Sequence, residues 1–239
     1  MANIKQIIKI DICSQTAHFR IYGNQNFCDS YPLPPPSTVL GILREILGKR
    51  PPEPLTIAIK GFFEGMFFDY RTFLSGAFTS RDKIWLEKIV NRKVETKPLY
   101  VKVLYKPRYI IYLDAPENHD FYISKLNNPD GYISLGRSED IAMLKASTVS
   151  ATKKQAKKPD RVKIENSYLP KEVYGSVPLY IPVCHLKDRN LKMERIYYIQ
   201  EAISYYEGEY WETSDGDRFL WLIEYIDTES GNLPRVFRE

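Results

Sequence analysis

Two short segments of the chain carry residue types that can bind phosphate. Ser37 and Thr38 follow three consecutive prolines and precede an apolar run with helical spacing, so we expect one of them to cap a helix. The first turn of a helix leaves backbone N–H groups unpaired, and its positive dipole end favours an anion. In the second segment, Gly136 lets the backbone approach a phosphate closely and Arg137 adds a forked donor. Simple capping, and a tight turn with a solvated arginine, are the alternative explanations.

Other residues are candidates for stacking on bases or for contacting phosphates. Tyr31 stands beside the proline-rich turn, where it either stacks on a base or fills the core. Arg71 and Arg81 lie in an irregular segment, and Lys106 and Arg108 flank a proline. Surface solubility is the alternative for each of these cations. The candidate set for binding RNA is therefore Tyr31, Ser37, Thr38, Arg71, Arg81, Lys106, Arg108, Gly136 and Arg137.

The chain offers little for metal-dependent or nucleophilic chemistry. Its three cysteines lack CxxC spacing and its three histidines lie far apart in sequence, so neither a zinc site nor a disulfide framework is expected. A Walker lysine loop is missing, which argues against nucleotide hydrolysis, and we expect no cluster of acidic residues that would support metal-dependent cleavage. We expect no cofactor. Only His18, near the proline-rich turn, is considered for acid–base catalysis, and a satisfied structural histidine is the alternative.

Charge is distributed unevenly along a chain whose composition is that of a folded globular protein. Residues 1–200 contain 31 Lys and Arg against 20 Asp and Glu, whereas residues 201–239 contain 3 against 10. A basic body fits a polyanionic partner, and the acidic end either faces a basic neighbour or folds back on the body. The 18 tyrosines suit base stacking or half-exposed sheet faces.

Hydropathy argues against a membrane location. No stretch approaches the roughly 20 apolar residues that span a bilayer, and the N-terminus lacks the apolar core of a signal peptide. We expect a cytoplasmic protein without a membrane partner.

Hydrophobic periodicity predicts an α+β fold. Residues 4–12 alternate as a half-buried strand, residues from Ser37 to about 47 form a helix that Gly48 ends, and residues 55–60 form a second strand. Further strands are predicted at 100–113 and 141–149, with a helix at 120–127 between them. The segments in order are strand, helix, strand, strand, helix and strand, over residues 1–150, with an inserted arm at about 61–98 that includes a short helix near 84–89.

This order is that of a ferredoxin-like domain of the RNA-recognition type. Such a sheet leaves one face open, where aromatic and basic side chains can meet single-stranded RNA. Residues 151–239 contain three short β-like runs, at 177–183, 197–203 and 219–226, and predict a small antiparallel C-terminal β domain.

Two of these segments resemble sequence blocks of a known family. Residues 30–43 (SYPLPPPSTVLGIL), following Ala17-His18-Phe19-Arg20, resemble the N-terminal signature of the "Cas five" family of type I CRISPR complexes. Residues 132–140 (YISLGRSED) resemble its second block. Order, spacing and length also match, so the resemblance covers the whole chain, and we expect a type I-B-like complex.

The resemblance implies a subunit of a Cascade surveillance complex in antiviral defence. In this family the subunit caps one end of the complex, holds the 5′ handle of the guide RNA (crRNA), and touches the backbone subunit and the large subunit. The arm at 61–98 would correspond to a thumb-like hairpin that reaches over the duplex of guide and target DNA.

One branch of the family is a metal-independent endoribonuclease that cuts precursor guide RNA. It uses a tyrosine near the proline-rich turn and an adjacent Lys-His pair, which suits the base, acid and cation that such cleavage needs. Tyr31 would fill the first role here, but the chain contains no Lys-His dipeptide. We therefore expect a non-catalytic subunit; the alternatives are the processing endoribonuclease and an interaction module whose tyrosines serve a protein interface.

Overall fold

The alternating isoleucines of the N-terminus form the first strand of a large sheet, β1 (Ile4–Ser14). The structure, a computed structural model, describes residues 4–21, 27–48, 55–75, 95–115, 119–156, 162–185, 191–200, 206–225 and 235–237. Strands β4 (Leu55–Phe62), β7 (Arg108–Asp114), β1 and β9 (Ile141–Ala156) are neighbours in this order, and every pair is antiparallel. The strands predicted at 4–12, 55–60 and 141–149 are confirmed.

The long strand predicted at 100–113 is two strands. The chain turns between β6 (Glu95–Tyr105) and β7, at Lys106, which has a φ of 45°. Pro107 follows, and a proline cannot donate to a sheet ladder, so the strand pattern breaks there. Because β6 belongs to a second sheet, this turn separates the body of the protein from its arm.

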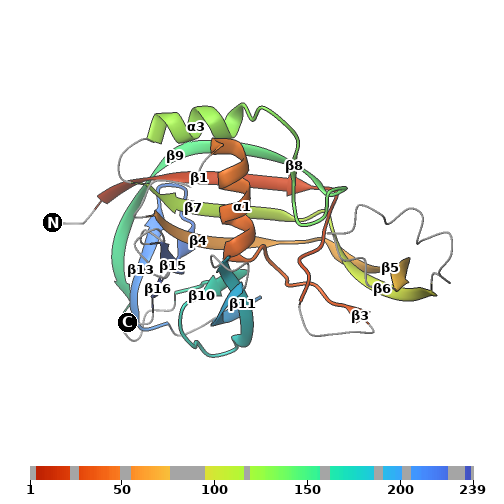
Figure 1. Ribbon diagram of the computed structural model, residues 1–239. Coiled ribbons are helices and arrows are strands. Elements are labelled where there is room, and N and C mark those ends of the chain that lie inside the picture. Colours follow the sequence, from red (N-terminus) through yellow and green to blue (C-terminus); the bar gives the residue numbers. More distant parts are fainter. Residues whose placement is uncertain are drawn as a thin grey trace.

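Two helices are described, α1 (Pro36–Leu47) and α3 (His119–Asn127). The buried side of α1 carries Val39, Leu43 and Ile46 at helical spacing, and these pack into the largest apolar core with Ile10 of β1. Gly48 ends the helix in the left-handed conformation, with a φ of 65°, as its sequence position predicts. Figure 1 shows α1 crossing β1, β7 and β4. No helix among the described residues is long and apolar enough to cross a membrane.

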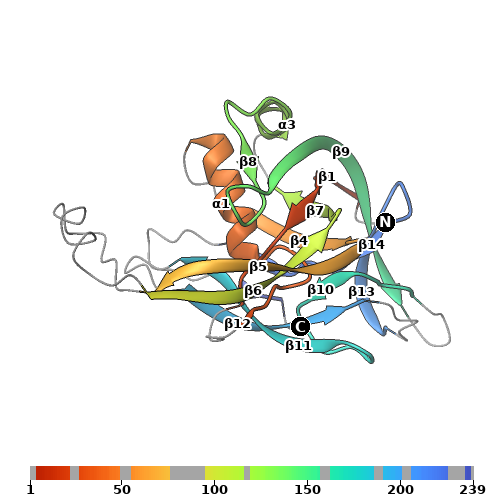
Figure 2. The ribbon, with the colours of Figure 1, turned by 90° about the vertical axis from the view of Figure 1, so that its right-hand side faces the viewer.

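The face of the sheet opposite α1 is not open. The prediction of an exposed sheet face that binds RNA is therefore wrong. This face is covered by β13 (Gly208–Thr213), which pairs with β9, and by β14 (Arg218–Phe219). The ring of Phe219 stacks on that of Tyr112, with centroids 4.2 Å apart. Ile7 is buried beneath this cover, although the sequence pattern placed only its alternate neighbours in the core. Figure 2 shows α1 and β13 on opposite sides of the strands.

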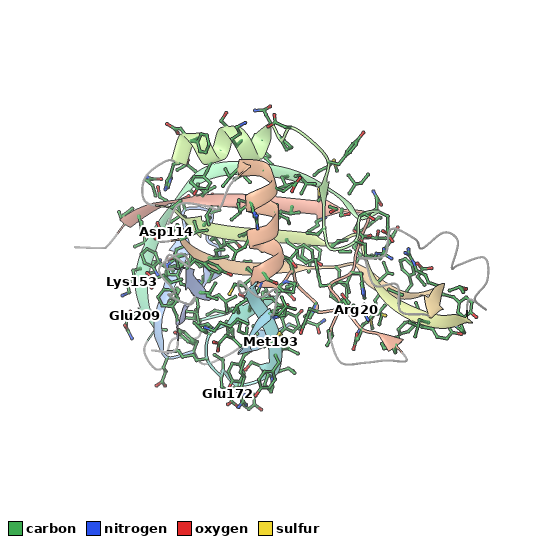
Figure 3. All side chains as sticks on the ribbon, in the orientation of Figure 1. Arg20, Asp114, Lys153, Glu172, Met193 and Glu209 are labelled. Atoms are coloured by element: carbon green, nitrogen blue, oxygen red, sulfur yellow. The ribbon has the colours of Figure 1, made fainter. Side chains whose placement is uncertain are left out.

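Ion pairs show that the acidic end folds back on the basic body. Asp217 accepts hydrogen bonds from the Tyr112 hydroxyl at 2.7 Å and from Lys60 Nζ at 3.2 Å, and Lys9 Nζ lies 3.8 Å away. Between the neighbouring strands β9 and β13, Lys153 pairs with Glu209 at 2.5 Å (both labelled in Figure 3). The structure therefore shows one of the two explanations of the charge asymmetry, in which the acidic end folds back on the basic body.

Asp217 makes stability depend on pH in the acid range. Burial raises the pKa of its carboxyl, but the Tyr112 hydrogen bond and the charges of Lys60 and Lys9 outweigh this and hold it below its usual range. The group therefore stabilises the fold above the unfolded-state pKa of about 4, and that contribution is lost as pH falls through the lower folded-state pKa. We expect Asp217→Asn to be less stable than wild type at pH 7, with the gap closing below about pH 4. Urea titrations across pH 3–7 measure this, and a gap independent of pH would contradict it.

The C-terminal strands extend the same sheet. β10 (Ser167–Leu169) pairs with β4 and with β12 (Leu191–Ile199), and β12 pairs with β11 (Val177–His185). The remaining strands are β15 (Ile223–Tyr225), which pairs with β4, and β16 (Arg235–Val236). The division expected at residue 150 falls inside β9. The described chain is thus mainly β, and an α+β class describes it only loosely.

A hairpin projects from the body where the arm was predicted. β5 (Gly65–Ser75) and β6 form it, and the short strands β2 (Thr16–Ala17) and β3 (Phe27–Cys28) join it to the body (Figures 1 and 2). One more short strand, β8 (Ile133–Ser134), pairs with β9. The helix predicted near 84–89 lies outside the described residues.

Candidate nucleic-acid interface

Both segments singled out in the sequence line one cleft of about 790 Å³. Its walls are the first turns of α1, residues 132–139, residues 18–20 and part of β5. This volume lies in the range of ligand-binding pockets. Five of the nine predicted residues meet in it: Ser37, Thr38, Arg71, Gly136 and Arg137.

The helix at the cleft does not begin as predicted. α1 starts at Pro36, with Pro35 as the preceding cap residue and no side-chain cap, so the expectation that Ser37 or Thr38 caps it is wrong. Proline is favoured at the first helical position because its φ is preset and its missing N–H costs nothing there. The amides of Thr38 and Val39 both donate to the Pro35 carbonyl, at 2.9 and 3.1 Å. The helix therefore presents the Ser37 and Thr38 residues to the cleft from within its first turn.

Gly136 is required by close packing of the protein on itself. It has a φ of 99°, and a Cβ atom there would lie 2.1 Å from the His18 carbonyl oxygen. The loop that follows is tight, because the Leu135 amide donates to the Asp140 carbonyl at 2.7 Å. The close approach that we attributed to a phosphate is thus, in this structure, an approach to the backbone of residue 18.

Arg137 is held by a buried carboxylate. Its Nε and Nη2 donate to the two oxygens of Asp140 at 2.8 and 2.7 Å, and the Thr16 hydroxyl donates to the same carboxylate at 2.5 Å. Only 15% of the Arg137 side chain is exposed, so the alternative of a solvated arginine is wrong. Its third nitrogen, Nη1, is buried and has no hydrogen-bond partner among the described residues.

Arg71 ties the hairpin to the loop at 136–140. Its Nε lies 2.6 Å from Asp69 on the same strand, and its Nη1 lies 2.6 Å from Glu139. The pKa of Glu139 is lowered by a hydrogen bond from its own backbone amide and by the nearby Arg71 and Arg137, although partial burial opposes this. Glu139 is therefore ionised at neutral pH. It lines the cleft with Arg71 and Arg137, and Asp69 and Asp140 behind them complete a cluster of two guanidinium and three carboxylate groups.

His18 lines the cleft as a neutral side chain. The residue is only 7% exposed, and Nδ1 lies 2.8 Å from the Lys102 carbonyl oxygen. Because a carbonyl oxygen only accepts, Nδ1 carries the proton. Burial lowers the pKa of His18, and Arg137 lowers it further, against the opposing effect of the Lys102 carbonyl. This environment matches the alternative explanation of His18, a structural histidine with a satisfied hydrogen bond.

Four predicted residues do not join the cleft. Tyr31 is buried and its hydroxyl donates to the Tyr180 carbonyl at 2.5 Å, so the prediction that it stacks on a base is wrong. Lys106 pairs with Glu64 at 3.3 Å, and Arg108 is exposed at the start of β7; neither lines the cleft. Arg81 lies outside the described residues.

Several lining residues were missed by sequence reasoning. Tyr132 is 89% exposed at the cleft, and Arg20 is exposed at the end of the sheet from which the hairpin projects (Figure 3). Ser138 and Glu139 also line it. Three of these four belong to the segment 132–140, so considering every polar residue of that segment would have found them. Among the described residues, no group of three or more His, Cys, Asp or Glu side chains is placed to hold a metal ion.

The described residues thus form a mainly β body with a projecting hairpin and a polar cleft. Residues 14–178 match the family model described as "CRISPR-associated protein (Cas_Cas5)". This match covers most of the chain, and the protein belongs to that CRISPR-associated family. A search of curated proteins finds no match.

Three solved CRISPR structures match this chain at low sequence identity. A type III-B Cmr-beta complex bound to cognate target RNA and AMPPnP contains a chain with a TM-score of 0.50 and 12% identity; the match covers 82% of this protein and 84% of that chain. A CRISPR RNA-guided surveillance complex matches with a TM-score of 0.48 at 12% identity, over 82% and 91%. A CRISPR protein from Archaeoglobus fulgidus matches with 0.46 at 12%, over 90% and 98%.

Proposed function

We propose that this protein is a non-catalytic subunit of a type I, I-B-like surveillance complex and that its cleft binds the 5′ handle of the guide RNA. One observation carries the proposal: Ser37, Arg71 and Arg137, which are far apart in sequence, converge on a single cleft. Hydroxyl and guanidinium groups are among the side chains that contact the phosphates of nucleic acids. Tyr132 adds an exposed ring beside them, which suits an unstacked base.

The strand order supports a ferredoxin-like first half. The neighbours β4-β7-β1-β9, all antiparallel, with α1 and α3 between strands in sequence, follow the split βαβ plan. The hairpin of β5 and β6 is inserted between the second and third of these strands, where a thumb-like arm is expected. Exposed apolar side chains on it suit contact with the backbone and large subunits and with a guide–target duplex: Met66, Phe68, Tyr70 and Tyr100.

The environment of the candidate catalytic residues supports a binding role. Tyr31 is buried beneath the proline-rich turn, so its hydroxyl is unable to reach a ribose 2′-OH in this conformation. His18 is almost fully buried, and the sequence contains no Lys-His dipeptide. In this proposal a separate endonuclease makes the guide RNA.

A single experiment tests the proposal against both alternatives. The purified chain is incubated in EDTA with labelled repeat RNA from the CRISPR array of the same genome, and binding and cleavage are followed on native and denaturing gels. We expect intact RNA and handle-preferring binding that weakens steeply with salt. Site-specific cleavage would assign the protein to the processing endoribonucleases, and weak, salt-insensitive binding would favour an interaction module.

Arg71 gives the cleanest test of the cleft. Arg71→Ala should weaken RNA binding about 3- to 10-fold at constant salt and reduce the salt slope by about one, because one phosphate contact is lost. Arg137→Ala is less informative, because it also leaves the Asp140 carboxylate buried and unpaired. Arg195→Ala, an exposed arginine of β12 outside the cleft, is the matched control. Equal losses in both variants, measured by fluorescence anisotropy, would remove the cleft as the binding site.

A further inference from the structure

One carboxylate oxygen lies between two guanidinium groups that come from different parts of the fold. Oε1 of Glu139 is 2.6 Å from Nη1 of Arg71, on the hairpin, and 3.5 Å from Nη1 of Arg137, on the loop. Both arginines line the cleft. Two forked donors converging on one anionic oxygen form the arrangement that binds a phosphate group in proteins.

The arginine pair is not fully satisfied by this carboxylate. Nη1 of Arg137 is buried and has no hydrogen-bond partner in the described part of the chain; Glu139 at 3.5 Å and Asp69 at 3.8 Å contact it as long ion pairs only. A buried donor without a partner costs free energy. A ligand that places an oxygen against each arginine would satisfy both.

Burial distinguishes the carboxylates that are fixed from the one that can leave. The Asp140 side chain is fully buried and holds the other two nitrogens of Arg137. Glu139 is 42% exposed and contacts the arginines from the solvent side of the loop. Its side chain can therefore rotate into water without exposing the apolar core.

We propose that Arg71 and Arg137 form one composite phosphate site, and that Glu139 occupies it in the free protein and is exchanged for a backbone phosphate when RNA enters the cleft. This inference rests on the proposed function for the identity of the ligand, but the anion site itself does not depend on it. With Asp69, Glu139 and Asp140 present, the cluster has one more negative than positive charge. Glu139 thus opposes anion binding and sets how strongly an anion must bind to enter.

The test removes the negative charge of Glu139, the group that occupies the site in the free protein. Glu139→Gln is compared with wild type and with Glu165→Gln, whose side chain is 39% exposed and pairs with Lys163 outside the cleft. Inorganic pyrophosphate is the probe, and its affinity is measured by isothermal titration calorimetry. We expect Glu139→Gln to bind it about 5- to 10-fold more tightly than wild type, Glu165→Gln to match wild type, and Glu139→Gln with Arg71→Ala to lose the gain.

The outcomes separate this inference from the proposed function. Equal pyrophosphate affinity for Glu139→Gln and wild type would overturn the composite site, even if wild type binds repeat RNA. A pyrophosphate gain without RNA binding by any variant would leave the anion site standing and overturn handle binding. If Glu139→Gln lacks a cooperative melting transition, Glu139→Asp takes its place, because its shorter side chain withdraws the same charge from Arg71, and the same two criteria apply.

Discussion

Gly136→Ala is expected to lower the free energy of unfolding by about 3 kcal/mol, which in a chain of this size is a fall of about 6–12 °C in melting temperature. The residue has a φ of 99°, where side chains are strained, and the new Cβ would meet the His18 carbonyl oxygen at 2.1 Å. A backbone oxygen cannot rotate away, so the loop at 136–140 must move off β2 and its neighbours. That movement displaces Arg137 and Glu139, and RNA binding should fall together with stability.

Gly41 provides the control for this substitution. It also lines the cleft, but it lies within α1 and a Cβ there would meet nothing within 4 Å. Gly41→Ala should therefore leave the fold unchanged or stabilise it by about 0.5–1 kcal/mol, because alanine is the better helix former. Urea denaturation followed by tryptophan fluorescence measures both variants. Similar stabilities for Gly136→Ala and wild type would show that the loop does not need its close packing on residue 18.

Local patterns predicted most of the elements near the cleft. The alternation of isoleucines specifies β1, and the apolar spacing followed by Gly48 specifies where α1 ends, because both signals act within a few residues. The cap of α1 predicted at Ser37 or Thr38 lies two or three residues after the observed cap residue, Pro35. Serine and threonine are strong cap residues, but a proline at the first helical position removes the need for a side-chain cap.

Features that depend on distant packing were not readable from the sequence. The cover on the sheet brings Phe219 onto Tyr112, 107 residues away in the chain, and no local periodicity encodes that contact. Tyr31 is buried, and its hydroxyl donates to the Tyr180 carbonyl of β11. The position of that strand depends on the whole extended sheet. Only the acidic composition after residue 200 indicated that this end folds back on the body.

The candidate site was predictable by residue type but not by arrangement. Gly136 and Arg137 were identified from their phosphate-binding chemistry. In the structure Gly136 also packs against the His18 carbonyl, and Arg137 also donates to Asp140. The sequence could not show that Arg71 reaches the same cleft, since this requires the hairpin to fold against the loop. For the same reason Glu139, which contacts Arg71, was not considered, although it is only two residues from Arg137.

Asp140→Ala is expected to lower the free energy of unfolding by about 3–4 kcal/mol, because removing one partner of a buried ion pair leaves the other uncompensated. The Asp140 side chain is fully buried, accepts two hydrogen bonds from Arg137 and accepts a third from Thr16. Asp130→Ala is the control: its side chain is 86% exposed and pairs with Lys125 at 3.4 Å, so its loss should change stability by less than about 0.5 kcal/mol.

A double-mutant cycle separates the ion pair from simple loss of packing. If the cost of Asp140→Ala comes from the stranded Arg137 guanidinium, then Arg137→Ala with Asp140→Ala should be destabilised by less than the two single variants added together, because no unpaired buried charge remains. Additive losses would instead mean that each side chain contributes through its own packing. The first result would establish that this ion pair within the loop fixes the conformation of the loop bearing Gly136 and Glu139, while Thr16 of β2 holds the same Asp140 carboxylate. Exchange at Glu139 would then leave the rest of the cleft in place.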